Sequence, residues 1–157
     1  MNSDYAKLLS ETEDELNRIK TWVNKNARDA EASYLINYSV IKSSGTIEVV
    51  FKSILVDYLS NEALPETSYY LEKTIIESSI NPKTGNICKL LEKINPDWKN
   101  QFSVAVNGSG KKSDLNSLVQ LRNGFAHGER ISVTITTVIN YYKSACEIMN
   151  ILDNVIN

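Results

Sequence analysis

Apolar residues recur at intervals of three and four along most of this chain, and this helical period constrains its fold more than any other feature. The most regular stretch forms one apolar stripe of seven residues: Ile47, Val50, Phe51, Ile54, Leu55, Tyr58 and Leu59. The β-branched run 132–138 has the composition of a strand, but no second alternating run exists to pair with it. We interpret that run as an extended entry into a last helix, so the sequence predicts an all-α protein.

The periodic segments and the turn residues between them predict where the helices begin and end. We expect helices over about residues 4–26, 29–61, 67–79, 86–94, 97–104, 113–127 and 138–152, with loops at 81–86 and 107–112. Ser113 is expected to cap one helix and Gly128 to follow its end. The core face of this helix is predicted to consist of Leu115, Leu118, Val119 and Phe125. Gly45 interrupts the long second helix, which indicates a kink or a close approach of another helix. The length of 157 residues suits a single-domain bundle over residues 1–157, with two long core helices and several short ones.

The charge balance excludes a generally basic nucleic-acid-binding protein. The net charge is −2, but it is unevenly distributed: residues 98–130 contain five basic and two acidic side chains, a local charge of +3, which leaves −5 for the rest. Binding to RNA or DNA would therefore depend on a local basic site and would be sensitive to salt.

The chain has one histidine and two isolated cysteines, Cys88 and Cys146, so the sequence predicts no metal site and no cofactor. We interpret the cysteines as reduced, buried thiols of a cytoplasmic protein. The first residues are polar and acidic, unlike a signal peptide, and no apolar run approaches the roughly 20 residues of a membrane span.

The six residues 122–127, Arg-Asn-Gly-Phe-Ala-His, lie at the predicted end of a helix and contain two side chains capable of catalysis, the Arg122 guanidinium and the His127 imidazole. Arg122 offers a planar, permanently charged fork that suits a phosphate, and His127 can exchange a proton near neutral pH. A separation of five residues is about 140° around a helix, so the two side chains would not face one point. Either the helix frays at residues 124–126, or the pair meets through a partner molecule, such as a second copy related by a two-fold axis. The alternative is a structural pair, with His127 capping its helix or pairing with Glu129.

These six residues and their flanks resemble the Arg-x4-His motif of the HEPN superfamily, and the RiboL-PSP-HEPN type in particular. The resemblance extends to residues 114–121 before the motif and Gly128-Glu129 after it. It also includes Ser44-Gly45-Thr46-Ile47-Glu48 in the long helix and the pair Tyr141-Tyr142 in the last one. It spans roughly residues 36–152.

The resemblance implies a HEPN-type helical bundle that forms a homodimer and acts as a metal-independent endoribonuclease of a bacterial toxin–antitoxin or phage-defence system. Arg122 and His127 map onto the catalytic pair, and Asn123 onto a residue that supports it. The 2′-hydroxyl of the RNA would attack the phosphate in a site composed at the dimer interface, leaving a 2′,3′-cyclic phosphate. An antitoxin or another regulatory protein is a further expected partner, and no membrane is expected.

Glu48 is a candidate to orient Arg122 or His127, and the alternative is an exposed ion pair with Lys52. Lys111, Lys112 and Arg130 are candidate RNA contacts, although the two lysines fit a solvated loop equally well. The alternative to a ribonuclease is a HEPN module that binds RNA or a protein without catalysis.

Overall fold

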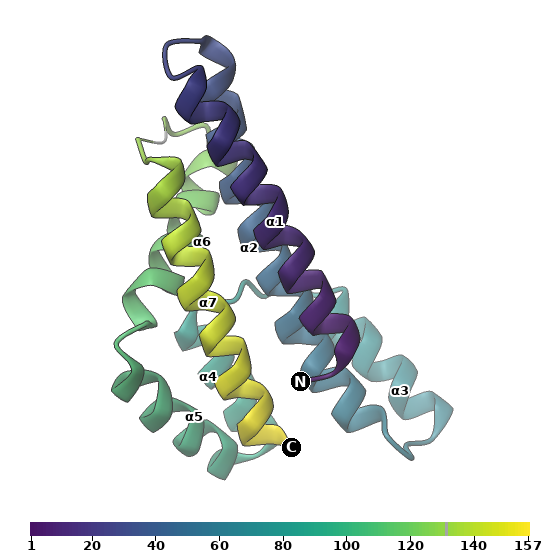
Figure 1. Ribbon diagram of the computed structural model, residues 1–157. Helices are drawn as coiled ribbons and strands as arrows, with labels where there is room; N and C mark the ends of the chain where they lie inside the picture. Colours follow the sequence, from purple (N-terminus) through teal and green to yellow (C-terminus); the bar gives the residue numbers. More distant parts are fainter. Residues whose placement is uncertain (131) are drawn as a thin grey trace.

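The computed structural model describes residues 1–130 and 132–157, and all regular structure in them is helical. Figure 1 shows the arrangement, in which both termini lie at the lower end. The helices in chain order are α1 (Ser3–Lys25), α2 (Ala30–Ser60), α3 (Pro65–Leu71), the π-helix η1 (Glu72–Ile76), α4 (Thr84–Ile94), α5 (Pro96–Ser109), α6 (Lys112–Ala126) and α7 (Ile135–Ile156). The all-α prediction is confirmed, and three helices rather than two exceed 20 residues.

Helices α2 and α7 form the centre of the bundle, and α1 and α6 each pack on both of them (Figure 1). Five of the seven residues of the α2 stripe are buried as predicted: Ile47, Val50, Phe51, Ile54 and Leu55. Leu59 is half-buried, and Tyr58, near the end of the helix, is 44% exposed. A buried hydrogen bond of 3.1 Å joins the hydroxyls of Thr12 and Thr46 between α1 and α2. Apolar burial of this extent is the main term that stabilises such a bundle.

The predicted role of Gly45 as a point of close helix approach within the chain is wrong. Helix α2 runs without interruption through Gly45, and a Cβ added there would meet no described atom within 4 Å. Gly45 is exposed on the outer face of α2, so the absence of a side chain leaves an open strip of backbone instead.

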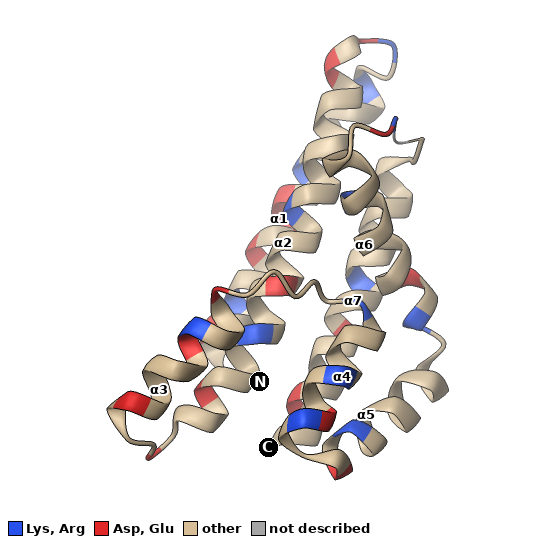
Figure 2. Ribbon diagram, turned by 180° about the vertical axis from the view of Figure 1, so that it is seen from behind, with Lys and Arg blue, Asp and Glu red and all other residues tan. Residues whose placement is uncertain are grey.

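Residues 65–76 form an arm that projects from the end of α2 (Figure 1). Pro65 starts it in the first turn, where its missing N–H is not needed. Among the described helices, α3 and η1 pack only on α2. The helix expected to reach residue 79 ends at Ile76, and the segment after η1 crosses behind the bundle to α4 (Figure 2).

The flexible loop expected at residues 107–112 is wrong, because both flanking helices extend into it. Phe102 and Val106, one turn apart, are buried and continue α5 to Ser109. Gly110 then reverses the chain with φ +69, a conformation that favours glycine. Helix α6 begins at Lys112 without a side-chain cap, so Ser113 lies within it and does not cap it.

Helix α7 begins at Ile135, after Thr134 caps its first turn by accepting from the Thr137 N–H at 3.1 Å. The β-branched run is therefore not a strand, as predicted, but only its first part leads into the helix, since residues 135–138 already belong to α7. Tyr142 lies fully buried in α7 and donates to the Leu9 carbonyl oxygen at 2.9 Å, which ties α7 to α1. In the described part of the chain, no helix combines the length and apolarity that crossing a membrane requires.

Candidate functional site

The six-residue motif lies at the end of α6, whose first half is anchored by buried Leu115, Leu118 and Val119. The backbone N–H of His127 donates to the carbonyls of Asn123 and Gly124, both at 3.1 Å, and Gly128 follows with φ +80. Helical geometry thus persists through residues 124–126, and the expectation that the helix frays there is wrong. With the helix continuous to Ala126, a separation of five residues still corresponds to about 140° around the axis between positions 122 and 127.

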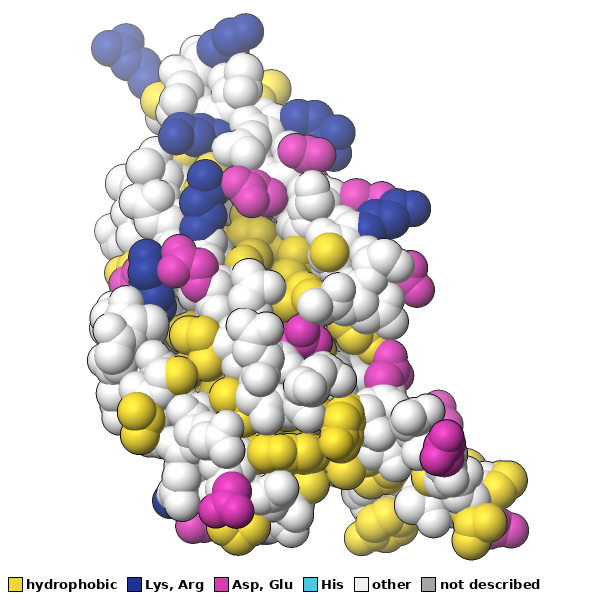
Figure 3. Space-filling view, turned by 60° about the horizontal axis from the view of Figure 1, so that its bottom comes forward, with side chains coloured by type: hydrophobic (Ala, Val, Ile, Leu, Met, Phe, Trp, Pro, Cys, Tyr) yellow, Lys and Arg dark blue, Asp and Glu magenta, His cyan; other side chains and the backbone are white. Residues whose placement is uncertain are grey.

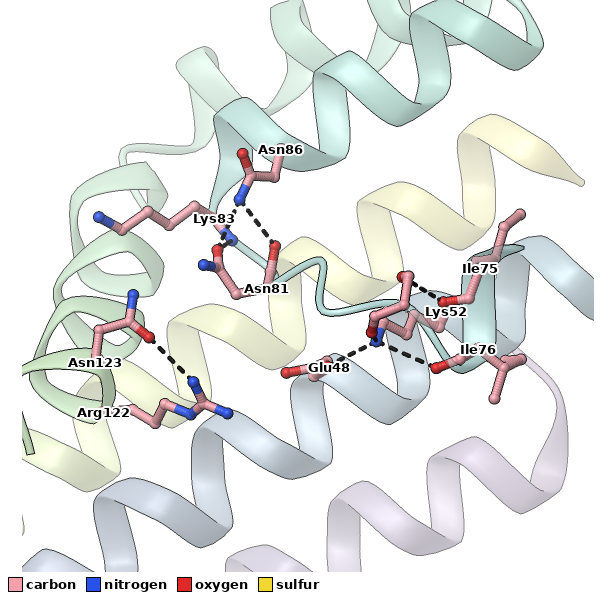
Figure 4. Close-up of polar contacts among 10 residues, drawn as sticks. Glu48, Lys52, Ile75, Ile76, Asn81, Lys83, Asn86, Arg122 and Asn123 are labelled. Carbon is pink, nitrogen blue, oxygen red and sulfur yellow. Dashed lines mark hydrogen bonds and ion pairs between the residues drawn. The ribbon is translucent and has the colours of Figure 1, made fainter. Parts of the chain in front are cut away.

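Arg122 is held in place without being neutralised. Its Nη1 donates to the Asn123 side-chain oxygen at 3.2 Å, and it forms no ion pair with a described carboxylate (Figure 4). The side chain is half-buried, whereas the other three arginines, at positions 18, 28 and 130, are exposed. Most of the five N–H donors of this guanidinium therefore remain available to a ligand.

Glu48 forms the expected pair with Lys52, at 2.7 Å, but the pair is not exposed, because Lys52 is only 4% exposed. Lys52 Nζ also donates to the carbonyl oxygens of Ser78 at 2.6 Å and Ile76 at 3.3 Å, and so fastens the end of the arm to α2. Figure 4 shows Arg122 reaching from α6 toward the side of α2 where Glu48 lies. Because the charge of the Glu48 carboxylate is already paired with Lys52, Glu48 does not form an ion pair with Arg122.

Lys83 is a cation beside the motif that the sequence did not reveal. Asn81 orders its loop: the Asn81 side-chain oxygen accepts from the Lys83 N–H at 3.2 Å and from the Asn86 amide at 2.8 Å. Thr84 then binds the Asn116 side-chain oxygen through its N–H and its hydroxyl, at 3.0 and 3.2 Å, which fastens the loop to α6. Figure 4 shows the Lys83 side chain extending on the side of Asn123. The position of Lys83 depends on the contact between Thr84 and Asn116, which are 32 residues apart, so no local sequence pattern predicts it.

His127 is exposed and forms no ion pair with Glu129 or another described carboxylate. It occupies the C-cap of α6, but it does so through its backbone N–H, so the ring is not needed for the cap. Phe125, which we expected in the core face of this helix, is 36% exposed. The end of the motif therefore opens to solvent.

The candidate RNA contacts occupy two different places. Lys111 pairs with Glu147 at 3.3 Å and Lys112 donates to the Asn107 side chain at 3.1 Å, both at the start of α6 rather than on a loop. They lie about 15 Å along the axis from Arg122, given a rise of 1.5 Å per residue. Arg130 follows the motif, is exposed and has no ion-pair partner in the described part of the chain.

Positive charge is concentrated at one end of the molecule. Figure 3 shows most Lys and Arg side chains of the visible face on its upper half, with acidic side chains among them, and few on its lower half. The upper end contains the α1–α2 turn and the segment that follows α6 (Figure 1). The net charge of the chain is −2, so these basic side chains are a local feature of its surface.

In the described ranges, no three His, Cys, Asp or Glu side chains gather closely enough to hold a metal ion. A search of curated proteins and a search of solved structures each found no match to this chain. The family model of RiboL-PSP-HEPN, however, matches residues 2–157, which include the motif and every helix described above. The chain therefore belongs to the RiboL-PSP-HEPN family.

Proposed function

We propose that this protein is a metal-independent endoribonuclease whose site combines Arg122 and His127 of two copies. The observation that carries the proposal is the state of Arg122, which is half-buried, oriented by Asn123 and free of any ion pair with a described carboxylate. An oriented guanidinium of this kind is suited to a phosphate group, which it can bind with two parallel hydrogen bonds.

The chemistry requires only groups that the chain and its substrate supply. The 2′-oxygen of the RNA attacks the adjacent phosphorus, and the bond to the 5′-oxygen breaks. His127 accepts the proton of the 2′-hydroxyl or donates one to the leaving 5′-oxygen, and Arg122 neutralises the charge on the phosphate oxygens. The products are a 2′,3′-cyclic phosphate and a 5′-hydroxyl. DNA has no 2′-hydroxyl and is not a substrate.

A second copy resolves the divergence of the two side chains. Arg122 reaches toward α2 (Figure 4), and five residues of helix separate it from His127 by about 140° around the axis, so in this proposal another protomer supplies the missing partner. The outer face of α2 offers a surface for that protomer: exposed apolar side chains flank the open backbone at Gly45. They are Tyr34, Tyr38, Ile41 and Val49.

Two neighbours support the role of Arg122. Lys52 binds the Glu48 carboxylate, so this acidic group does not compete with a phosphate for the guanidinium. Lys83 adds a half-buried positive charge on the side of Asn123. In this proposal Glu48 supports the site indirectly, as part of the framework that joins α2 to the arm, and Lys83 contacts the RNA backbone.

The family resemblance extends the proposal to biology. We place the ribonuclease in the cytoplasm, in a bacterial toxin–antitoxin or phage-defence system, with an antitoxin or another regulatory protein as its partner. Under that role, wild-type protein produced alone slows growth, and the Arg122→Ala variant does not.

The direct test incubates purified wild-type protein, Arg122→Ala and His127→Ala with total RNA in EDTA, with Lys73→Ala on the arm as the control for losing a cation. We expect cleavage by wild type and Lys73→Ala, 2′,3′-cyclic phosphate ends, and no cleavage by the other two variants. Equal cleavage by all four proteins would reveal a contaminant and refute the proposal. RNA binding without cleavage by wild type would favour a non-catalytic module instead.

A further inference from the structure

A cavity lies beside the motif, on the side of α6 away from Arg122. Its volume is about 330 Å³, and it is bounded by residues 117–124 of α6, by Glu129, Arg130 and Ser132, and by Tyr141 of α7. Gln120 and Gly124, which line it, are each two residues from Arg122 and so lie about 160° around the helix from it. The cavity is therefore separate from the surface that we assign to the scissile phosphate.

The polar side chains of this cavity have free hydrogen-bonding capacity. Six of them line it, and none forms a side-chain hydrogen bond or ion pair with another described residue: Ser117, Gln120, Glu129, Arg130, Ser132 and Tyr141. In particular, the Glu129 carboxylate and the Arg130 guanidinium are adjacent in sequence but do not pair with each other. Free donors and acceptors around a concave space are typical of a site that recognises a polar ligand.

Gly124 fixes the position of the Glu129 carboxylate at the wall of the cavity. The Glu129 backbone N–H donates to the Gly124 carbonyl at 2.9 Å, which turns the chain back along α6. Its side chain then lies so close that a Cβ on residue 124 would be 2.6 Å from Glu129 Oε2. The carboxylate therefore occupies space that only a glycine at position 124 leaves open.

We propose that this cavity binds a guanine base of the RNA substrate, an inference that rests on the proposed ribonuclease function. Guanine presents two adjacent N–H donors on its Watson–Crick edge, which match the two oxygens of the Glu129 carboxylate. Arg130 can donate to the O6 and N7 acceptors, and the half-buried Tyr141 ring supplies a surface for stacking.

Charge and size favour a base over a phosphate in this cavity. One carboxylate and one guanidinium give it no net charge, and the carboxylate repels a phosphate. Its volume is at the small end of ligand sites, which range from about 300 to 1,000 Å³. Adenine, cytosine and uracil each offer a single N–H group or amino group beside acceptors and so leave one Glu129 oxygen unmatched. Because α6 separates the cavity from the surface that carries Arg122, the bound base does not belong to the scissile nucleotide itself. It belongs to a nearby nucleotide of the same RNA.

The binding test uses the Arg122→Ala variant, which cannot cleave under the proposed mechanism. Its affinity is measured for short uridine oligonucleotides that contain one guanosine, inosine or adenosine, and separately for guanosine monophosphate. We expect the guanosine oligonucleotide to bind about tenfold more tightly than the adenosine one, with inosine between them because it lacks the 2-amino group. Glu129→Gln should remove this preference, and Glu147→Gln, which removes a carboxylate on α7, should retain it.

Cleavage mapping separates the failure of this inference from the failure of the ribonuclease proposal. Selective binding of the guanosine oligonucleotide with no cleavage by wild type would support the cavity and refute the ribonuclease. Cleavage by wild type at positions unrelated to guanine, unchanged in Glu129→Gln, would overturn the base site and leave the ribonuclease intact. Binding of guanosine monophosphate without a preference among the oligonucleotides would assign the cavity to a free nucleotide and overturn the RNA inference.

Discussion

The Glu129 carboxylate lies against the backbone of Gly124, five residues earlier, where the Cβ of any other residue would be 2.6 Å from Oε2. The glycine of the motif therefore determines where the Glu129 carboxylate lies in the cavity beside it. A glycine near the end of α6 costs helix stability, but here it leaves space for an acidic group.

Replacing Gly124 by Ala should therefore affect recognition more than folding. The atom that the new Cβ displaces is the end of a flexible side chain, so the carboxylate moves away at little cost. The helix gains up to about 1 kcal/mol from alanine. We expect an unchanged or slightly higher melting temperature and loss of the guanosine preference, as in Glu129→Gln. A variant that keeps the full preference would show that the Glu129 position does not depend on Gly124.

Lys52 is expected to hold the arm to the bundle, because α3 and η1 pack on no other described helix. Lys52→Met removes the ammonium from two carbonyl oxygens and leaves the Glu48 carboxylate uncompensated. We expect the free energy of unfolding to fall by roughly 2–4 kcal/mol. Amide hydrogen exchange should also accelerate over residues 65–78.

The double variant Lys52→Met with Glu48→Gln is the control for the unpaired charge. It should recover part of the lost stability, since no buried carboxylate then lacks a partner. Lys52→Met should also lower ribonuclease activity, because the Glu48 carboxylate that Lys52 releases is then available to pair with Arg122, and the double variant should restore that activity. Exchange in α3 that is unaffected by Lys52→Met would contradict the role of this lysine.

The two adjacent tyrosines of α7 provide a matched pair for testing the core. Tyr142 donates a buried hydrogen bond to Leu9, so Tyr142→Phe should lower the free energy of unfolding by about 1 kcal/mol. Tyr141 is half-buried, and its hydroxyl bonds to no described residue, so Tyr141→Phe should change stability by less than about 0.5 kcal/mol. Urea denaturation of both variants distinguishes them, and equal effects would argue against the Tyr142 contact.

Stability should fall in alkaline solution, because burial raises the pKa of the Cys146 thiol from 9.0 to about 12. The folded state keeps this thiol protonated, while the unfolded state ionises it above pH 9.0, so rising pH favours unfolding between 9.0 and about 12. Burial also raises the pKa of Tyr142, which acts in the same direction. We expect Cys146→Ala to flatten the pH dependence of the urea midpoint in this window. A slope identical to that of wild type would exclude the thiol.

Sequence periodicity predicted most of the helices because each buries one apolar face. The α2 stripe is buried from Ile47 to Leu55, and Leu115, Leu118 and Val119 of α6 are buried where the periodicity placed them. It failed where local turn residues were outweighed by packing, as at the end of α5, where buried Val106 extends the helix. Phe125 was expected in the core, but the structure leaves it 36% exposed.

The candidate site was predicted only as far as it is contiguous in sequence. Arg122, Asn123 and His127 could be identified as a motif, but Lys83 reaches α6 through the Thr84–Asn116 contact, which joins positions 32 residues apart. The burial of Lys52 likewise depends on carbonyl groups of the arm, 24 and 26 residues away. Periodicity contains no information on such contacts, nor on the cavity that Glu129 and Tyr141 line together.

The most direct test of the account is a mixed dimer in which one copy has Arg122→Ala and the other His127→Ala, isolated by two different affinity tags. If each site takes Arg122 from one copy and His127 from the other, one of its two sites is intact, and we predict about half of the wild-type activity. Each variant alone should be inactive. A mixed dimer that is as inactive as its parents would contradict the composite ribonuclease site.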